Sequence, residues 1–297
     1  MSKLHFVTVS DDRFGRKAGQ YASTQKMVKD MLSSADHLKI SDLFFWKFDD
    51  ILKTDFYKKN RDLIDNPNPD MNGRCYKPFV ILDSLQRIGD GDFLIYNDIS
   101  PEHWINVSFD SEFIDTDVIK DLCDSNKGIL SSEVIWIVNN EVSPHTHENF
   151  TTEMCIETMN MRDYRYSIQH ASGMMVLRKN KTTIDFVREW LKWNSMPECA
   201  SLSSLDGSVN YYDSKKLGHR HDQSISGLLI NSMNGKIVKY IEGYNFTTFC
   251  RKNFPYQFIE TNQGPSEYVY KILNGSIIKD PRDPEKSSGS SNYPLNL

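Results

Sequence analysis

Short apolar runs alternate with amphipathic stretches along the chain, and this alternation is typical of an α/β protein. Short runs rich in apolar and β-branched residues predict strands at residues 4–9, 92–96, 134–138 and 172–177. The run at 92–96 is typical of a strand that is buried on both faces of a sheet. Apolar side chains three or four positions apart predict helices, which cover residues 21–32, 77–89, 183–193 and 225–233. The expected fold is a Rossmann-like, mostly parallel central sheet flanked by helices.

Local signals refine some of these boundaries. Helix 77–89 has Pro78 near its first position and Gly89 at its end, the positions that these residues favour in helices. The periodicity of residues 42–56 is mixed, and residues 236–246 indicate a late edge strand or hairpin. Ligands of doubly wound sheets bind beyond the carboxyl ends of the strands. The loops that follow the first two predicted strands are therefore the segments in which we expect a site.

Composition excludes several classes of protein. The chain carries 35 basic and 40 acidic side chains, a net charge of −5, so nothing indicates nucleic acid as a partner. No apolar segment of about 20 residues is present, which predicts no integral membrane segment. The five cysteines form no CxxC pair, as expected of reduced thiols. We expect a cytoplasmic protein whose tail at residues 279–297, rich in Pro, Ser, Gly and charge, is disordered.

Candidate ligand-binding residues gather at the ends of the first two strands and at the start of helix 77–89. A bound diphosphate needs its negative charge neutralised, either by a divalent cation or by Arg and Lys donors. Candidates for binding the nucleotide and its diphosphate are Ser10, Asp11, Arg13, Arg74, Lys77 and Asn97. Each basic residue has an alternative interpretation as a solvated surface charge, and Asp11 as a residue that forms the loop.

Asp98 lies two positions beyond the strand at residues 92–96. A carboxylate at this position is a candidate ligand for Mn²⁺ or Mg²⁺, because the strand fixes the backbone while the side chain points into the crevice. The alternative is that Asp98 caps the next turn. Asn97 and Ser100 surround this single carboxylate, so an Asp-x-Asp pair is incomplete, and further ligands must come from elsewhere in the chain.

The densest polar chemistry lies just before helix 225–233. His219 and His221 are candidate metal ligands, and Asp222 and Gln223 are candidate catalytic residues. The alternative interpretation is a helix N-cap at Asp222 next to surface histidines. Both interpretations can hold at once.

Three groups of motifs resemble those of capsular-polysaccharide and large-DNA-virus glycosyltransferases. The first joins Arg74-Cys75-Tyr76-Lys77-Pro78 to Gly91-Asp92-Phe93-Leu94-Ile95-Tyr96-Asn97-Asp98. The second is Gln169-His170-Ala171-Ser172-Gly173 with the following strand and helix, and the third is His219-Arg220-His221-Asp222-Gln223-Ser224. The resemblance covers about residues 4–235, with the motifs in the same order.

The resemblance implies a GT-A fold that transfers a sugar from a nucleotide diphosphate sugar, most readily a UDP- or GDP-sugar, to a glycan or other hydroxyl acceptor. It places Asp98 beside the metal and diphosphate, and Asp222 with Gln223 near the reacting sugar. One domain is expected at residues 1–278, with a nucleotide-binding half at 1–110 and an acceptor and catalytic half at 111–278. The family's Asp-Ala-Gly appears here as Asp98-Ile99-Ser100, which puts metal dependence in question.

Two other classes stay open. A non-catalytic protein that binds nucleotide sugars or glycans would keep the same fold, and the incomplete Asp-x-Asp favours it. A Rossmann-type methyltransferase shares a first strand that ends in an acidic loop, but residues 11–16 contain a single glycine and no GxGxG. We rank the glycosyltransferase first and the methyltransferase last.

Overall fold

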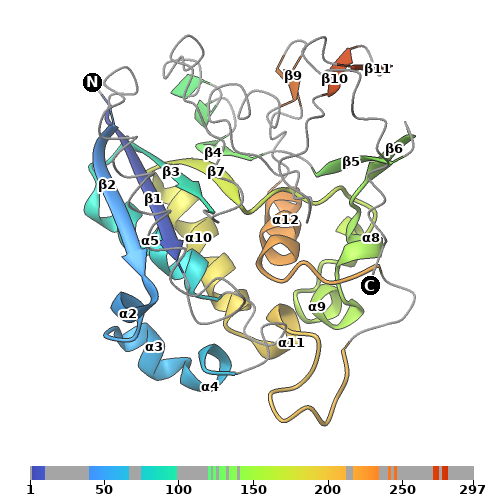
Figure 1. The fold of residues 1–297 in the computed structure, drawn as a ribbon, viewed down its shortest axis with the longest axis horizontal. Coiled ribbons are helices and arrows are strands. Elements are labelled where there is room, and N and C mark those ends of the chain that lie inside the picture. Colours follow the sequence, from blue (N-terminus) through green and yellow to red (C-terminus); the bar gives the residue numbers. More distant parts are fainter. Residues whose placement is uncertain are drawn as a thin grey trace, which may run out of the picture.

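The computed structural model describes residues 2–10, 40–66, 75–98, 120–121, 123–124, 127–131, 134–138, 141–211, 217–233, 240–241, 244–245, 270–273 and 276–279. A five-stranded sheet with the order β2-β1-β3-β7-β4 forms its centre (Figure 1). Its strands are β1 (Leu4–Ser10), β2 (Ile40–Lys47), β3 (Phe93–Asn97), β4 (Ile129–Leu130) and β7 (Met174–Arg178). The expected α/β class is confirmed.

The sheet is mixed, so the expectation of a mostly parallel sheet was wrong. Strand β1 runs parallel to both β2 and β3, whereas β7 runs antiparallel to β3 and to β4. Strand β3 is buried along its length, and β7 is buried at Met175, Val176 and Leu177. Such an apolar run has the same pattern in either direction. Periodicity therefore located these strands without giving their direction.

The predicted strand at residues 134–138 is present as β5 (Ile135–Val138), but it lies outside the central sheet. It pairs antiparallel with β6 (Glu141–Pro144). The late hairpin is confirmed as β8 (Tyr240–Ile241) and β9 (Tyr244–Asn245), and β10 (Tyr270–Leu273) pairs with β11 (Ser276–Lys279).

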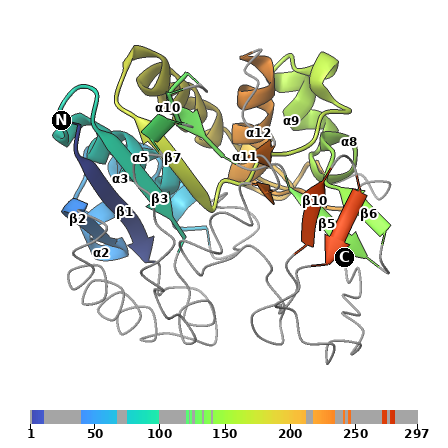
Figure 2. The same cartoon turned by 90° about the horizontal axis from the view of Figure 1, so that it is seen from above.

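Two long helices cover one face of the central sheet. Helix α5 (Tyr76–Arg87) and helix α10 (Lys181–Asn194) contact each other, and α5 also contacts β1 and β3 (Figure 2). Helix α10 begins at its N-cap Asn180, whose side chain accepts a hydrogen bond from Thr183 N at 2.9 Å. The apolar sides of both helices join the inner face of the sheet in one core.

Helix α12 (Asp222–Ser232) contacts α10 at the side of the sheet. Trp190 of α10 donates its indole N–H to the carbonyl oxygen of Asp222 at 3.0 Å, which fixes the start of α12 against α10. Shorter helices complete the described part: α2 (Phe48–Ile51), α3 (Asp55–Lys59), α4 (Arg61–Ile64), α8 (His147–Phe150), α9 (Glu153–Thr158), η3 (Arg162–Tyr164) and α11 (Pro197–Ala200). Among the described residues, no helix combines the length and the apolar character needed to cross a membrane.

The strand order creates a switch point between β1 and β3. After β1 the chain adds β2 on one side, and then passes through α5 to add β3 on the other side. These connections leave in opposite directions, and ligands of open α/β sheets bind beyond the carboxyl ends of the strands at such a point. Thr8 ties the two ends together by donating its hydroxyl to the carbonyl oxygen of Asn97 at 2.7 Å.

Candidate functional site

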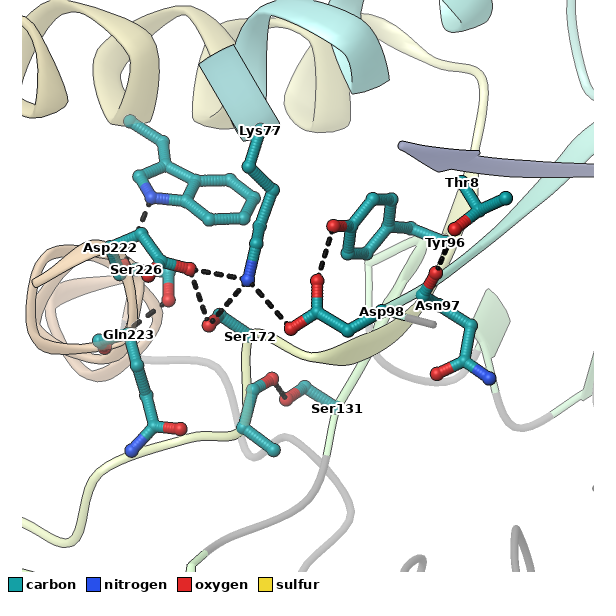
Figure 3. Close-up of polar contacts among 12 residues, drawn as sticks. Thr8, Lys77, Tyr96, Asn97, Asp98, Ser131, Ser172, Asp222, Gln223 and Ser226 are labelled. Atoms are coloured by element: carbon teal, nitrogen blue, oxygen red, sulfur yellow. Dashed lines mark hydrogen bonds and ion pairs between the residues drawn. The ribbon is translucent and has the colours of Figure 1, made fainter. Parts of the chain in front are cut away.

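A buried lysine lies between two aspartates at this switch point (Figure 3). Lys77 Nζ is 2.6 Å from Asp222 Oδ2, 3.0 Å from Asp98 Oδ2 and 3.4 Å from Ser172 Oγ. The lysine side chain is 3% exposed. An ammonium group offers three N–H donors, and here three oxygens surround it, which compensates for its removal from water.

Four separate segments build this cluster, which we call the Lys77 cluster: Lys77, Asp98, Ser172 and Asp222. Lys77 lies in the first turn of α5, and Asp98 directly follows β3. Ser172 precedes β7, and Asp222 is the first residue of α12. The cluster thus ties two helices to the carboxyl end of a central strand.

The two aspartates differ in their access to solvent. The side chain of Asp98 is 39% exposed and that of Asp222 is 6% exposed. Asp222 Oδ2 also accepts a hydrogen bond from Ser172 Oγ at 2.7 Å. Asp98 is therefore the carboxylate that a ligand can reach, while Asp222 is enclosed by donors.

Tyr96 holds the other oxygen of Asp98. Its hydroxyl donates to Asp98 Oδ1, and its ring lies under the Lys77 ammonium, with Nζ 5.5 Å from the centroid. Burial, followed by the negative charge of Asp98, raises the pKa of Tyr96 well above its usual value. The phenol therefore stays protonated and keeps donating across the physiological pH range.

The start of α12 corrects one expectation. The N-cap of this helix is His221 and not Asp222, and the carboxylate of Asp222 points to Lys77 and Ser172 (Figure 3). His221 has φ +47° and ψ −116°, a region that residues with a side chain seldom adopt. Its Nδ1–H donates to the carbonyl oxygen of Ala200 at 2.8 Å, which holds this sharp turn in place.

His219 stabilises the same turn through both of its ring nitrogens. Nδ1 accepts from Thr152 N at 3.2 Å, and Nε2–H donates to the carbonyl oxygen of Cys199 at 2.9 Å. Burial, and next the neighbouring His221, lower the pKa of His219 to about 3. His219 is thus a neutral, buried side chain whose two nitrogens are both engaged by the backbone.

These contacts do not fit a divalent cation held by Asp98, His219 and His221. The ammonium of Lys77 stands where a cation shared by the two aspartates would lie, and the nitrogens of His219 are occupied. In the described part of the chain, no three His, Cys, Asp or Glu side chains gather in a way that would hold a metal ion. The predicted role of Mn²⁺ or Mg²⁺ gains no support from these residues.

Asn97 and Asp98 point in different directions (Figure 3). Successive side chains of a strand alternate between the two faces of the sheet, so Asn97 faces away from Lys77. Asn97 is 3% exposed, and within the described part of the chain its Nδ2 has no hydrogen-bond acceptor. If Asn97 contacts a nucleotide, as predicted, it does so on the face of the sheet opposite Lys77.

Of the other predicted binding residues, only Ser10 and Lys77 lie within the described part of the chain. Ser10 is the last residue of β1, at the switch point. Asp11, Arg13 and Arg74 lie outside the described residues. Lys77 is inside the site, but its partners are carboxylates, so it is not a free donor for a diphosphate as we expected.

Two residues of the site were not singled out by the sequence. Ser172 was assigned to a strand at residues 172–177, but it precedes β7 and donates to Asp222. Gln169 is fully buried and accepts from Gln223 Nε2 at 2.9 Å. The only signal for either residue was the motif Gln169-His170-Ala171-Ser172-Gly173, whose polar residues directly precede an apolar strand in the sequence.

Comparisons with known proteins give no relative for this chain. No family model matches it, and neither a search of curated proteins nor a search of solved structures gives a match. Any function assigned to the chain therefore rests on the geometry of the Lys77 cluster and on its place in the fold.

Proposed function

We propose that this protein is a glycosyltransferase that moves a sugar from a nucleotide diphosphate sugar, such as a UDP- or GDP-sugar, to a hydroxyl acceptor. The observation that carries the proposal is the Lys77 cluster, with its exposed carboxylate, at the switch point between β1 and β3. Nucleotides bind at the switch points of open α/β sheets. A carboxylate at that edge supplies the polar group that sugar transfer requires next to the anomeric carbon.

The two carboxylates take different roles in this proposal. In the transfer, the acceptor oxygen forms a bond to the anomeric carbon, and the bond from that carbon to the diphosphate oxygen breaks. The diphosphate leaves with the bonding electrons, and the acceptor proton must pass to a base. We place Asp98 next to the substrate because it is 39% exposed, and we assign Asp222, 6% exposed, to holding Lys77.

Lys77 supplies a positive charge that needs no metal. Its ammonium offsets the negative charge of Asp98 and Asp222. This lowers the electrostatic repulsion that a negatively charged diphosphate would meet at the site. Since the described residues do not fit a divalent cation between the aspartates, no step of the proposed transfer passes through one. Arg13 and Arg74, which lie outside the described residues, stay the predicted donors to the diphosphate.

A thermal-shift screen against UDP-, GDP-, dTDP- and CMP-sugars tests the proposal. A ligand that binds the folded protein at a hundredfold excess over its Kd adds about 2.7 kcal/mol to the free energy of unfolding. We expect stabilisation by one class of sugar nucleotide. We expect it to persist in Asp98→Asn, which removes a negative charge from the site, as in the exposed Asp62→Asn on α4, the matched control. Stabilisation by S-adenosylmethionine, with none by a sugar nucleotide, would refute the proposal.

Turnover separates the enzyme from a binding protein. Release of the free nucleoside diphosphate from the stabilising sugar nucleotide, in the presence of glycan acceptors, is expected for wild type. In Asp98→Asn it should fall about 100-fold or more, as on loss of a general base. Binding without release of the diphosphate from any acceptor tried would assign the chain to the non-catalytic class.

A further inference from the structure

Gln223 follows Asp222 in the first turn of α12, and its amide group extends clear of the helix (Figure 3). Gln223 Nε2 donates to Gln169 Oε1 at 2.9 Å. An amide has one end that donates and one that accepts, so its orientation decides what the site offers to a substrate. The surroundings of Gln169 determine whether the nitrogen or the oxygen of each of the two amide groups faces the other.

Three acceptor oxygens lie within hydrogen-bond distance of Gln169 Nε2, Thr151 Oγ1 at 3.0 Å among them, and together they fix its orientation. Its Nε2 lies 3.0 Å from the carbonyl oxygen of Phe150, which can only accept. The same Nε2 lies 3.1 Å from Ser224 Oγ, whose own proton goes to the carbonyl oxygen of Phe150 at 2.8 Å. Gln169 is fully buried, so turning its amide over would leave oxygen against oxygen without water to compensate.

The orientation of Gln169 determines that of Gln223. Because the oxygen of Gln169 faces Gln223, the amide nitrogen of Gln223 must point to it, and Oε1 of Gln223 is left as an acceptor. No donor among the described residues contacts that oxygen, and the side chain is only partly buried. An oxygen held in this way suits a hydrogen-bond donor on a ligand.

We infer that Gln169 is a positioning residue that holds Gln223 with its Oε1 directed to accept a hydrogen bond from a hydroxyl group of the substrate. The inference that this hydroxyl belongs to a sugar rests on the proposed function. The orientation itself does not depend on it. The site would thus favour ligands that bring a hydrogen-bond donor to this oxygen.

Gln223→Glu tests the orientation without a ligand. The introduced carboxylate cannot donate to Gln169 Oε1 and places negative charge against that oxygen, so we expect a lower melting temperature than wild type at pH 8. On acidification the carboxyl group gains a proton to donate, so the difference from wild type at the same pH should shrink between pH 8 and pH 5. Gln86→Glu, on the exposed side of α5, is the matched control, and its small difference from wild type should not change in this way.

The opposite orientation predicts the opposite result. If Gln169 presented its nitrogen to Gln223, the carboxylate would gain a charge-assisted hydrogen bond, and Gln223→Glu would be as stable as wild type, or more so, at pH 8. That outcome would overturn the inference.

Gln223→Met tests the role toward the substrate by comparing UDP-glucose and UDP-galactose with UDP alone. In wild type we expect tighter binding of a sugar nucleotide than of UDP, and in the variant we expect this preference to fall by roughly tenfold, the value of a hydrogen bond at the upper end of its range. An unchanged preference would overturn the substrate part of the inference. If wild type binds neither sugar nucleotide nor any other of the panel, the proposed function fails, while the stability of Gln223→Glu still decides the orientation.

Discussion

Replacing Lys77 with methionine removes the charge at the centre of the site and keeps the length of the side chain. Lys77 is 3% exposed and lies 2.6 Å from Asp222 Oδ2, whose side chain is 6% exposed. In Lys77→Met the carboxylate of Asp222 stays buried and keeps the hydroxyl of Ser172 as a donor, but it has no cation. An isolated buried charge is costly because it has given up its hydration without gaining a partner.

The expected loss in the free energy of unfolding is about 3–5 kcal/mol, the usual result of removing one partner of a buried ion pair. Domains of this kind are stable by only about 5–15 kcal/mol, so the variant should unfold at a much lower urea concentration. Asp98 adds less to this loss, because at 39% exposure water solvates it when the lysine is gone. Asp98→Asn alone should therefore cost less than Asp222→Asn.

Equilibrium unfolding in urea, followed by circular dichroism, measures these differences. Lys181→Met is the matched control, since Lys181 pairs with Asp185 on α10 and is 89% exposed. An exposed pair contributes about 0–1 kcal/mol. Adding Asp222→Asn to Lys77→Met should recover part of the loss, because the second change removes the stranded charge. A loss in Lys77→Met no larger than that in Lys181→Met, or no recovery in the double variant, would show that the cluster does not hold the fold together.

Three further predictions concern other parts of the structure. Burial lowers the pKa values of His145 and His219 to about 3, below the value of 6.5 for an unfolded chain, so the stability they provide is complete above pH 6.5 and is lost as the pH falls toward 3. At pH 5, each of these two histidines should lower the free energy of unfolding by about 2 kcal/mol relative to pH 8, as measured by unfolding in urea. Equal stability at pH 5 and pH 8 would contradict this. Gly227→Ala should destabilise by about 1–3 kcal/mol in thermal unfolding, although alanine favours helices, because its Cβ would meet His147 Cε1 at 3.0 Å; a stabilised variant would show that His147 moves freely. Burial raises the pKa of Cys123 to about 12, so iodoacetamide at pH 8 should label it only after unfolding, and mass spectrometry that finds the label in the native protein would disprove this.

The sequence predicted the positions of the core elements well, for a physical reason. Helices α5 and α10 begin and end within about three residues of their expected bounds, because the spacing of their apolar side chains is a local property. The direction of β7 and the sheet to which β5 belongs depend on how distant segments meet. A run of buried apolar residues contains no information on either point. Residues 42–56, with their mixed periodicity, contain the end of β2 followed by α2 and the start of α3, so two different periods meet within one short stretch.

The candidate site shows the same division between local and distant information. That Asn97 and Asp98 face opposite sides of the sheet follows from the alternation of a strand, and it was available from their adjacency alone. The partnership of Lys77 with Asp98 and Asp222 was not available, because it joins helices and a strand whose packing sets the distances. Sequence reasoning assigned Lys77 to a diphosphate, Asp98 to a metal ion and Asp222 to catalysis, so each charged group was given a role toward a ligand. In the folded chain these charges pair with one another. The reason is that a buried charge without a partner costs a free energy that is large compared with the net stability of a domain. A substrate must therefore bind to what this pairing leaves accessible, which in the described residues is chiefly the open side of Asp98 and the oxygen of Gln223.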